Sequence, residues 1–332
     1  MGEVPSLPYG PIRKIKTRCT YGGRVQLSRL AFRAGRGVWA ARAAATAVLL
    51  IMVVALSVLT AQTVASSRAA QQPRATHLTA TTSIPSFQAG ELISDDAFYN
   101  AQAMTQAGIQ QWLLQMPCVP QDNSPCLAFF NQKTTTRPAN SNCARYPGAA
   151  DETAAAIVSK VARSCGISPR VLLVLVQKEQ SLITRPSAYG YERATGYACP
   201  DTGECEAKYY GFFNQLYSAA WQFREYANPH DHWSIRPGTA KLRYSPEASC
   251  GESVVHIANQ ATASLYLYTP YQPDAHTKAH PDGPADRCAA YGNLNFFRLY
   301  NVWFGDSRAV RFPEWWGPCL DHVDGIACRT RN

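Results

Sequence analysis

Residues Ser168–Leu182 read SPRVLLVLVQKEQSL, and this stretch decides the fold of the chain. Ser168 suits the N-cap of a helix, and Pro169 suits the first helical position. The apolar run 171–176 is longer than one amphipathic face needs, so we expect a helix enclosed by protein. The sequence therefore predicts a mainly helical domain built around a buried helix.

Glu179 lies near the end of this expected helix and shares a face with apolar residues at three- and four-residue spacing. These residues are Leu172, Leu175, Val176, Leu182 and Ile183. Burial favours the protonated form of a carboxylic acid, which is the form that a general acid needs to cleave a sugar–sugar bond. The alternative is a glutamate that turns to solvent or pairs with a neighbouring Lys or Arg.

The N-terminal part predicts export. Residues 1–42 carry nine Lys or Arg against Glu3, which is +8 of the formal net charge of +9. Residues 43–62 follow, uncharged and long enough to span a bilayer as a helix. The basic flank predicts a single-pass membrane protein with its C-terminal domain extracellular. Cleavage after Thr63-Val64-Ala65, giving a secreted protein, is the alternative. Because the rest of the chain is nearly balanced in charge, we expect no nucleic-acid partner.

Cysteine usage agrees with export. Apart from Cys19, ten cysteines lie in the exported part, an even number that indicates disulfides. Sequence neighbours suggest the pairs Cys118–Cys126, Cys143–Cys165, Cys199–Cys205, Cys250–Cys288 and Cys319–Cys328, although spacing alone does not fix connectivity. The spacings differ from the short Cys-x-x-Cys of zinc sites, and His230-x-His232 is a lone pair in a loop, so we expect no metal and no cofactor.

Composition divides the exported part into three. Residues 63–91 are rich in small and polar residues, which is typical of an extracellular spacer. Residues 92–305 are long enough for one sizeable core, and residues 306–332 form an aromatic tail with a disulfide loop. Expected helices cover 96–108, 109–115, 151–165, 168–183, 209–226, 259–267 and 293–304, and the best strand signals are 240–244 and 254–257.

The string Ile167-Ser168-Pro169 followed by VLLVLVQKEQSLI resembles the signature of soluble lytic transglycosylases in the lysozyme-like superfamily. The second half of that signature, a glycine segment with a glutamine, is matched by 210–215 (YGFFNQ). The resemblance covers residues 167–221, and the larger segment 92–305 is similar to a group of actinobacterial envelope proteins. The sequence departs from that signature in two places. Residues 179–181 read Glu-Gln-Ser where the family usually has Glu-Ser, and residues 211–215 read Gly-Phe-Phe-Asn-Gln where it usually has Gly-Leu-Met-Gln.

The resemblance implies a lysozyme-like α+β fold with long disulfide-pinned loops, and cleavage of peptidoglycan glycan strands by Glu179. In such enzymes the glutamate protonates the glycosidic oxygen and then takes the proton of the sugar's C6 hydroxyl, which gives an anhydro product. A hydrolase needs a second carboxylate. Candidates between the two motif halves are Glu192, Asp201, Glu204 and Glu206, which otherwise belong to a solvated loop.

Substrate contacts are expected from aromatic and amide side chains that stack on or orient sugar rings. The candidates are Gln215, Asn214, Tyr210, Tyr268 and Tyr271. Two rival interpretations are a non-catalytic glycan-binding or adhesion module on the same scaffold, and a structural protein of an envelope assembly. An open cleft around Glu179 would favour catalysis, whereas full burial or a salt bridge would favour the rivals.

Overall fold

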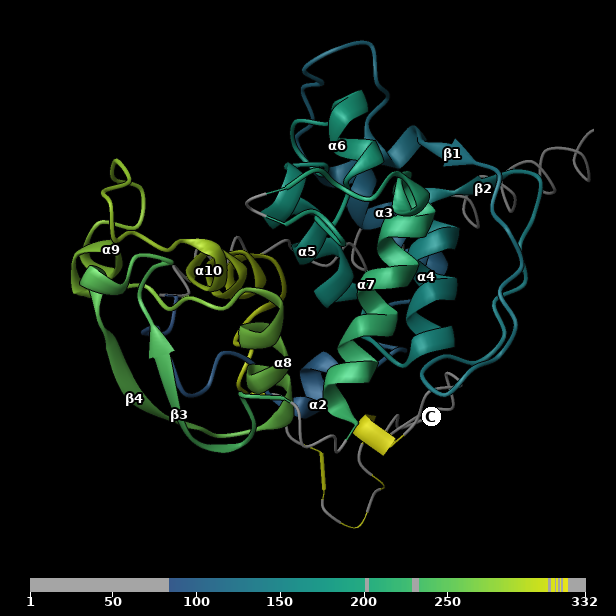
Figure 1. Cartoon of the computed structure of the whole chain (residues 1–332). Coiled ribbons are helices and arrows are strands. Elements are labelled where there is room, and N and C mark those ends of the chain that lie inside the picture. The colour runs from purple at the N-terminus through teal and green to yellow at the C-terminus, as the bar shows by residue number, and fades with distance from the viewer. Residues whose placement is uncertain are drawn as a thin grey trace, which may run out of the picture. The chain divides into compact units, whose positions relative to one another are not determined.

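A computed structural model describes residues 84–200, 203–228 and 233–309, with a few positions between 312 and 321. Within these ranges the domain is mainly helical with long loops, which confirms the predicted fold class at that level (Figure 1). No helix in the described ranges is long and apolar enough to cross a membrane. The predicted membrane segment 43–62, the basic segment 1–42 with Cys19, and most of the spacer lie outside the described residues.

Helix α5 (Pro169–Gln180) is the predicted buried helix, and every residue of its apolar run 171–176 is fully buried. Pro169 occupies the first turn as expected, but the side chain of Ser168 does not cap the helix. Its hydroxyl is buried without a partner, and its backbone N–H donates to Phe98 O at 2.7 Å. Ser168 is therefore used to attach the helix start to a distant segment.

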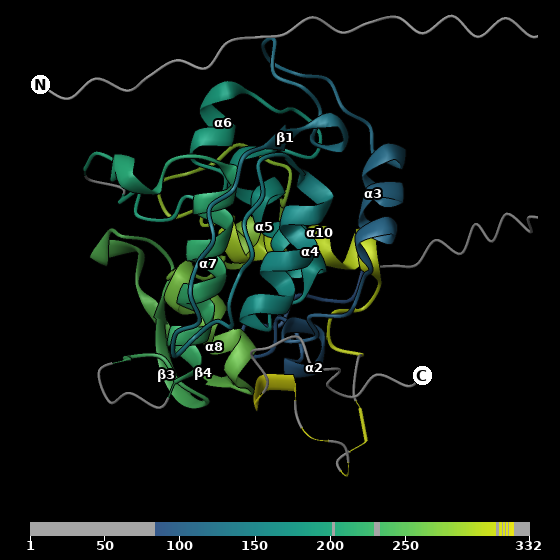
Figure 2. The ribbon, with the colours of Figure 1, turned by 90° about the vertical axis from the view of Figure 1, so that its right-hand side faces the viewer.

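The neighbours of α5 are α4 (Ala154–Cys165), α7 (Phe212–Ala227) and α10 (Gly292–Phe304), gathered at the centre of the domain in Figure 2. The Thr153 hydroxyl caps α4 at its start. Gly166, in the left-handed region with a φ of 65°, ends it, as the glycine stop in the sequence predicts. Three helices thus pack around α5 and bury its apolar residues.

The remaining helices are shorter. They are α2 (Asp95–Phe98), α3 (Gln106–Gln115), α6 (Ala188–Glu192), α8 (Gln260–Tyr268) and α9 (Ala275–Ala279). The expected helix over 96–108 is wrong in its middle part. The chain leaves α2 after Phe98, and a new helix starts where the Thr105 hydroxyl accepts a hydrogen bond from Gly108 N at 3.0 Å.

Two small antiparallel sheets complete the fold. Strands β3 (Gly238–Arg243) and β4 (Glu252–Ile257) pair with Lys241 opposite Val254, which confirms both predicted strand regions. In Figure 1 this hairpin lies on the far side of α8 and α10 from α4 and α7. The short pair β1 (Asn131–Gln132) and β2 (Glu152–Thr153) has no sequence signal, because its strands contribute two residues each.

Four of the suggested disulfides are present: Cys118–Cys126, Cys143–Cys165, Cys199–Cys205 and Cys250–Cys288. Cys319 is also disulfide-bonded, whereas Cys328 lies outside the described residues. The described part of the tail packs on the domain. Cys319 is buried in the core, and Arg224 Nη2 donates to Leu320 O at 2.7 Å.

Candidate functional site

Glu179 lies in the last turn of α5, and its side chain is 24% exposed. The ammonium group of Lys178 contacts its Oε1 atom. Lys178 is only 6% exposed, and its Nζ also donates to Thr269 Oγ1 at 2.9 Å, which holds it in place. The ion-pair alternative of the sequence analysis is thus present, with the neighbouring residue as the partner.

The backbone at Gly196 passes directly beside the Glu179 carboxylate. A Cβ atom on Gly196 would lie 3.5 Å from Glu179 Oε2, and the φ of Gly196 is +69°. Glycine is the residue that adopts this conformation without a steric penalty. The 195–199 loop therefore covers one side of the carboxylate, close to the Oε2 atom.

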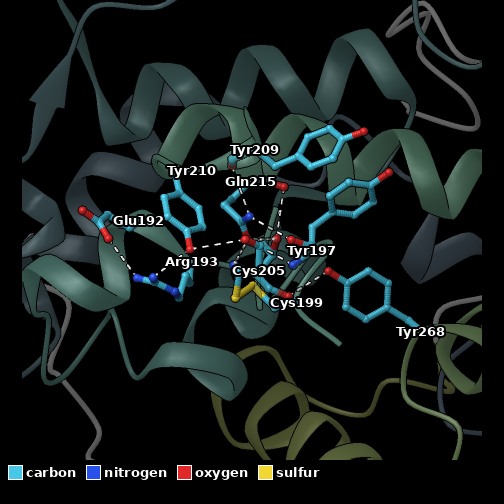
Figure 3. The surroundings of a disulfide bond; sticks show 10 residues. Glu192, Arg193, Tyr197, Cys199, Cys205, Tyr209, Tyr210, Gln215 and Tyr268 are labelled. Carbon is cyan, nitrogen blue, oxygen red and sulfur yellow. Dashed lines mark hydrogen bonds and ion pairs between the residues drawn. A yellow bond between two sulfur atoms is a disulfide. The ribbon is translucent and has the colours of Figure 1, made fainter. Parts of the chain in front are cut away.

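Gln215, from α7, holds this loop through both ends of its side-chain amide (Figure 3). Its Oε1 accepts hydrogen bonds from the backbone N–H groups of Thr195 (3.3 Å) and Tyr197 (3.0 Å). Its Nε2 donates to Tyr197 O (3.0 Å) and Tyr209 O (3.2 Å). Gln215 is fully buried, so its amide serves the backbone and has no surface atom to offer a ligand.

Beside the 195–199 loop is a pocket of about 500 Å³, called here the tyrosine pocket. Its aromatic wall consists of Tyr197, Tyr209, Tyr226 and Tyr268, and Gly196, Glu204 and Glu206 also line it. The disulfide Cys199–Cys205 closes the loop between Tyr197 and Tyr209, as Figure 3 shows, whereas Tyr226 and Tyr268 come from α7 and α8. The pocket combines flat rings with polar groups, which is the composition expected of a carbohydrate site.

Three tyrosines of the pocket, Tyr197, Tyr226 and Tyr268, have raised pKa values, so their hydroxyls remain protonated at neutral pH. Burial raises the pKa of Tyr197, and it raises the pKa of Tyr226 to about 12. Burial also raises the pKa of Tyr268, and the negative charge of the nearby Glu179 raises it further. The Tyr268 hydroxyl donates to Thr195 O at 2.8 Å, and its ring stacks on Phe223 with centroids 4.8 Å apart.

The other predicted contact residues lie elsewhere. Tyr210 accepts a hydrogen bond from Arg193 Nη2 at 2.8 Å, and Figure 3 shows this pair on the opposite side of Gln215 from Tyr268. Asn214 Nδ2 donates to Tyr210 O at 3.0 Å. Tyr271 forms a parallel bridge with Arg243 of β3 and does not line the tyrosine pocket. The structure thus brings together Glu179, Gln215 and Tyr268, and it leaves Tyr210, Asn214 and Tyr271 outside this group.

Two of the candidate second carboxylates line the pocket. Glu204 does so, and so does Glu206, which forms a 2.5 Å ion pair with the exposed Lys208. Glu192 is 55% exposed and pairs with Arg193 at 2.8 Å. Asp201, together with His230 and His232, lies outside the described residues.

Thr195 and Gly196, which connect Glu179 to Gln215 and Tyr268, were not predicted from the sequence. The available signal was the Thr-Gly-Tyr string just before Cys199, between the two halves of the motif. Backbone strain marks the same place. Among the described residues the non-glycine positions with positive φ are Ser181 (54°) and Ala198 (55°), which lie two residues after Glu179 and Gly196 respectively. Such strain concentrates at functional sites.

One comparison with known proteins gives a match. The model of a family described as "LasA, N-terminal domain" matches residues 91–316. The matched range contains Glu179, the 195–199 loop and the whole tyrosine pocket. Neither the curated proteins nor the solved structures gave a significant match.

Proposed function

This chain belongs to the LasA N-terminal domain family, and we propose that its exported domain cleaves the glycan strands of peptidoglycan with Glu179 as general acid and base. One observation carries the proposal. The partly exposed Glu179 carboxylate, at the end of a fully buried helix, lies against the loop that also lines a tyrosine pocket. The same arrangement supports the finer assignment to a lysozyme-like, lytic transglycosylase type of domain.

The tyrosine pocket suits sugar rings. Carbohydrates present flat apolar faces that pack on aromatic rings, and their hydroxyls take hydrogen bonds from phenols. Tyr197 and Tyr209 present such rings, with centroids 4.9 Å apart in an edge-to-face pair. Glu179 is not among the residues that line this pocket, so cleavage requires the strand to pass the Gly196 loop and bring a glycosidic bond to the carboxylate.

The chemistry needs one carboxyl group. Protonated Glu179 gives its proton to the glycosidic oxygen, the bond to the anomeric carbon breaks, and the leaving sugar departs as an alcohol. The Glu179 carboxylate then takes the proton of the C6 hydroxyl, whose oxygen attacks the anomeric carbon and closes the anhydro ring. Lys178 contacts Oε1, so Oε2 on the Gly196 side is the oxygen that exchanges the proton.

The proposed location is the cell membrane, with residues 43–62 as the anchor and the C-terminal domain outside. The four disulfides support exposure to an oxidising compartment. Protease added to intact spheroplasts should then remove the domain. A protected domain would overturn the proposed topology. Secretion after cleavage of the N-terminal segment is the alternative, and it predicts a free domain in the medium.

A non-catalytic glycan-binding or adhesion module is the second candidate. The contact between Lys178 and Glu179 favours it, because a lysine that is 6% exposed and fixed by Thr269 is a permanent partner for the carboxylate. A carboxylate that stays paired cannot deliver a proton. This candidate keeps the tyrosine pocket as the binding site and removes the cleavage step.

Digestion of purified peptidoglycan by the full chain, kept in mild detergent, tests the proposal. Mass spectrometry of the soluble products should find fragments with anhydro sugar ends. Fragments with ordinary reducing ends would instead indicate a hydrolase and point to Glu204 or Glu206 as the second carboxylate. Co-sedimentation with peptidoglycan without any soluble product would favour the binding module.

A further inference from the structure

A second pocket, of about 630 Å³, lies next to the tyrosine pocket and shares Tyr197 and Tyr209 with it. Its other walls include Arg137, Asn140, Lys208, Tyr217 and Trp221. We call it the cationic pocket. The shared tyrosines form the boundary between the two pockets, so a ligand that covers both rings reaches into both.

The two pockets differ in charge. The side chains lining the cationic pocket include Arg137 and Lys208 and no acid, whereas those lining the tyrosine pocket include Glu204 and Glu206 and no Lys or Arg. Lys208 already pairs with Glu206 of the tyrosine pocket, and neutral sugar rings give no reason for the remaining cation, Arg137, in the cationic pocket. A ligand group with negative charge does.

The guanidinium of Arg137 is only partly satisfied by the protein. Its Nη2 donates to Asn214 Oδ1 at 2.8 Å, and its Nε is buried without a hydrogen-bond partner. No acid in the described part of the chain forms an ion pair with it. A guanidinium has five N–H donors in a fork that matches a carboxylate.

Arg137 is nevertheless held in place. Its backbone exchanges two 3.0 Å hydrogen bonds with Tyr146, and its guanidinium lies 5.7 Å from the ring centroids of both Phe213 and Tyr217. A positioned but unpaired guanidinium in a pocket is the arrangement that proteins use to recognise carboxylates.

We infer that the cationic pocket binds a carboxylate of the peptide attached to the glycan strand, while the sugars of the same strand occupy the tyrosine pocket. The inference rests on the proposed function, in which the substrate is a glycan strand. It adds that this strand carries its peptide substituents. Arg137 takes the carboxylate, and the exposed Lys208, which also pairs with Glu206, adds positive charge to the pocket. Tyr217 and Trp221 supply apolar walls for the peptide. The domain therefore prefers peptide-bearing over bare glycan.

Binding, measured without cleavage, tests the inference separately from the proposed activity. The full chain with Glu179→Gln is titrated calorimetrically with three probes: a peptide-bearing tetrasaccharide of peptidoglycan, the same fragment with its peptide carboxylates amidated, and the saccharide with its peptides removed. Amidation or peptide removal should weaken binding about tenfold, the effect of one charge-assisted bidentate contact. Arg137→Gln should weaken binding of the first probe by a similar factor and leave the other two unchanged.

Controls make the result specific. Arg145→Gln removes the same charge from an exposed position of the same segment and should change nothing. Lys208→Gln changes a side chain that is 66% exposed, so it tests the pocket even if Arg137→Gln disturbs folding. This variant should also bind the first probe more weakly. Equal affinity for the first two probes would overturn the inference. Full affinity for the stripped saccharide, which keeps a carboxylate on the sugar itself, would also overturn the assignment to the peptide.

Discussion

The hydroxyl of Tyr268, at the end of α8, donates a 2.8 Å hydrogen bond to the backbone oxygen of Thr195. The two residues are 73 positions apart, and Thr195 directly precedes Gly196, where an added Cβ atom would lie 3.5 Å from Glu179 Oε2. Gln215 holds the same loop from the opposite side, through the backbone of Thr195 and Tyr197. The position of the loop over the glutamate thus depends on two side chains from two helices.

Tyr268→Phe tests the first of these contacts. The substitution removes the hydroxyl and keeps the ring that stacks on Phe223. We expect the free energy of unfolding to fall by about 1 kcal/mol, the usual net value of one hydrogen bond. Hydrogen exchange of the amides in 196–199 should become faster. Tyr189→Phe, at a ring that is 60% exposed, is the control and should leave both quantities unchanged. Unchanged exchange in Tyr268→Phe would mean that the hydroxyl does not hold the loop.

Gln215→Leu tests the second contact. Leucine fills a similar volume but leaves the buried backbone groups of Thr195, Tyr197 and Tyr209 without their partner. Because unsatisfied buried groups are costly, we expect a loss of about 3 kcal/mol in unfolding free energy. Denaturant unfolding measures it, with Gln111→Leu on the exposed side of α3 as the matched control. Equal stability of the two variants would contradict the role given to Gln215.

Removing either of two disulfides should lower the stability of the domain, but only one of the two removals should weaken glycan binding. Replacing Cys199 and Cys205 by serine should lower stability by about 2 kcal/mol, and replacing Cys143 and Cys165 by about 3 kcal/mol because the closed loop is longer. Only the first variant loses a wall of the tyrosine pocket. Glycan binding, measured well below each melting temperature, should therefore weaken in the first and persist in the second. The reverse pattern would place the glycan elsewhere.

Acid should weaken the attachment of the β1–β2 segment. Burial raises the pKa of Glu152, but hydrogen bonds from Lys160, Thr134 and Tyr146 outweigh this and lower it below the usual 4.5. A lowered folded-state pKa contributes stability that is fully present above the unfolded-state pKa and is lost as the pH falls through the folded-state value. Melting temperatures should thus drop below about pH 4.5. Glu152→Gln should remove part of this drop, whereas the exposed neighbour variant Asp151→Asn should keep it.

Local signals in the sequence were enough for most of the architecture. The apolar run before Glu179, the glycine after Cys165 and the two short strand signals correspond to α5, the end of α4 and the β3–β4 hairpin. Each of these is fixed by period, cap or turn chemistry within a few residues. Pairing each cysteine with its neighbour in the sequence likewise predicted four disulfides correctly.

The site was less accessible to such reasoning, because side-chain direction depends on distant partners. The sequence placed Gln215 near Glu179, but only the fold shows that its amide faces the buried backbone of 195–197. The contact between Lys178 and Glu179 depends on Thr269, ninety-one positions further on, which holds the ammonium. Tyr271 was expected among the sugar contacts together with Tyr268, but it forms a bridge with Arg243 of β3.

Glu179→Gln, assayed against wild type for the release of soluble fragments from peptidoglycan, tests the central claim most directly. The amide keeps the size of the side chain and has no proton to transfer, and general acid catalysis supplies roughly a hundred- to ten-thousand-fold in rate. We predict a loss of that order, with normal melting and normal peptidoglycan binding, and full activity in the control Glu192→Gln. Equal release by wild type and Glu179→Gln, or no release by folded wild type from any peptidoglycan, would contradict the account.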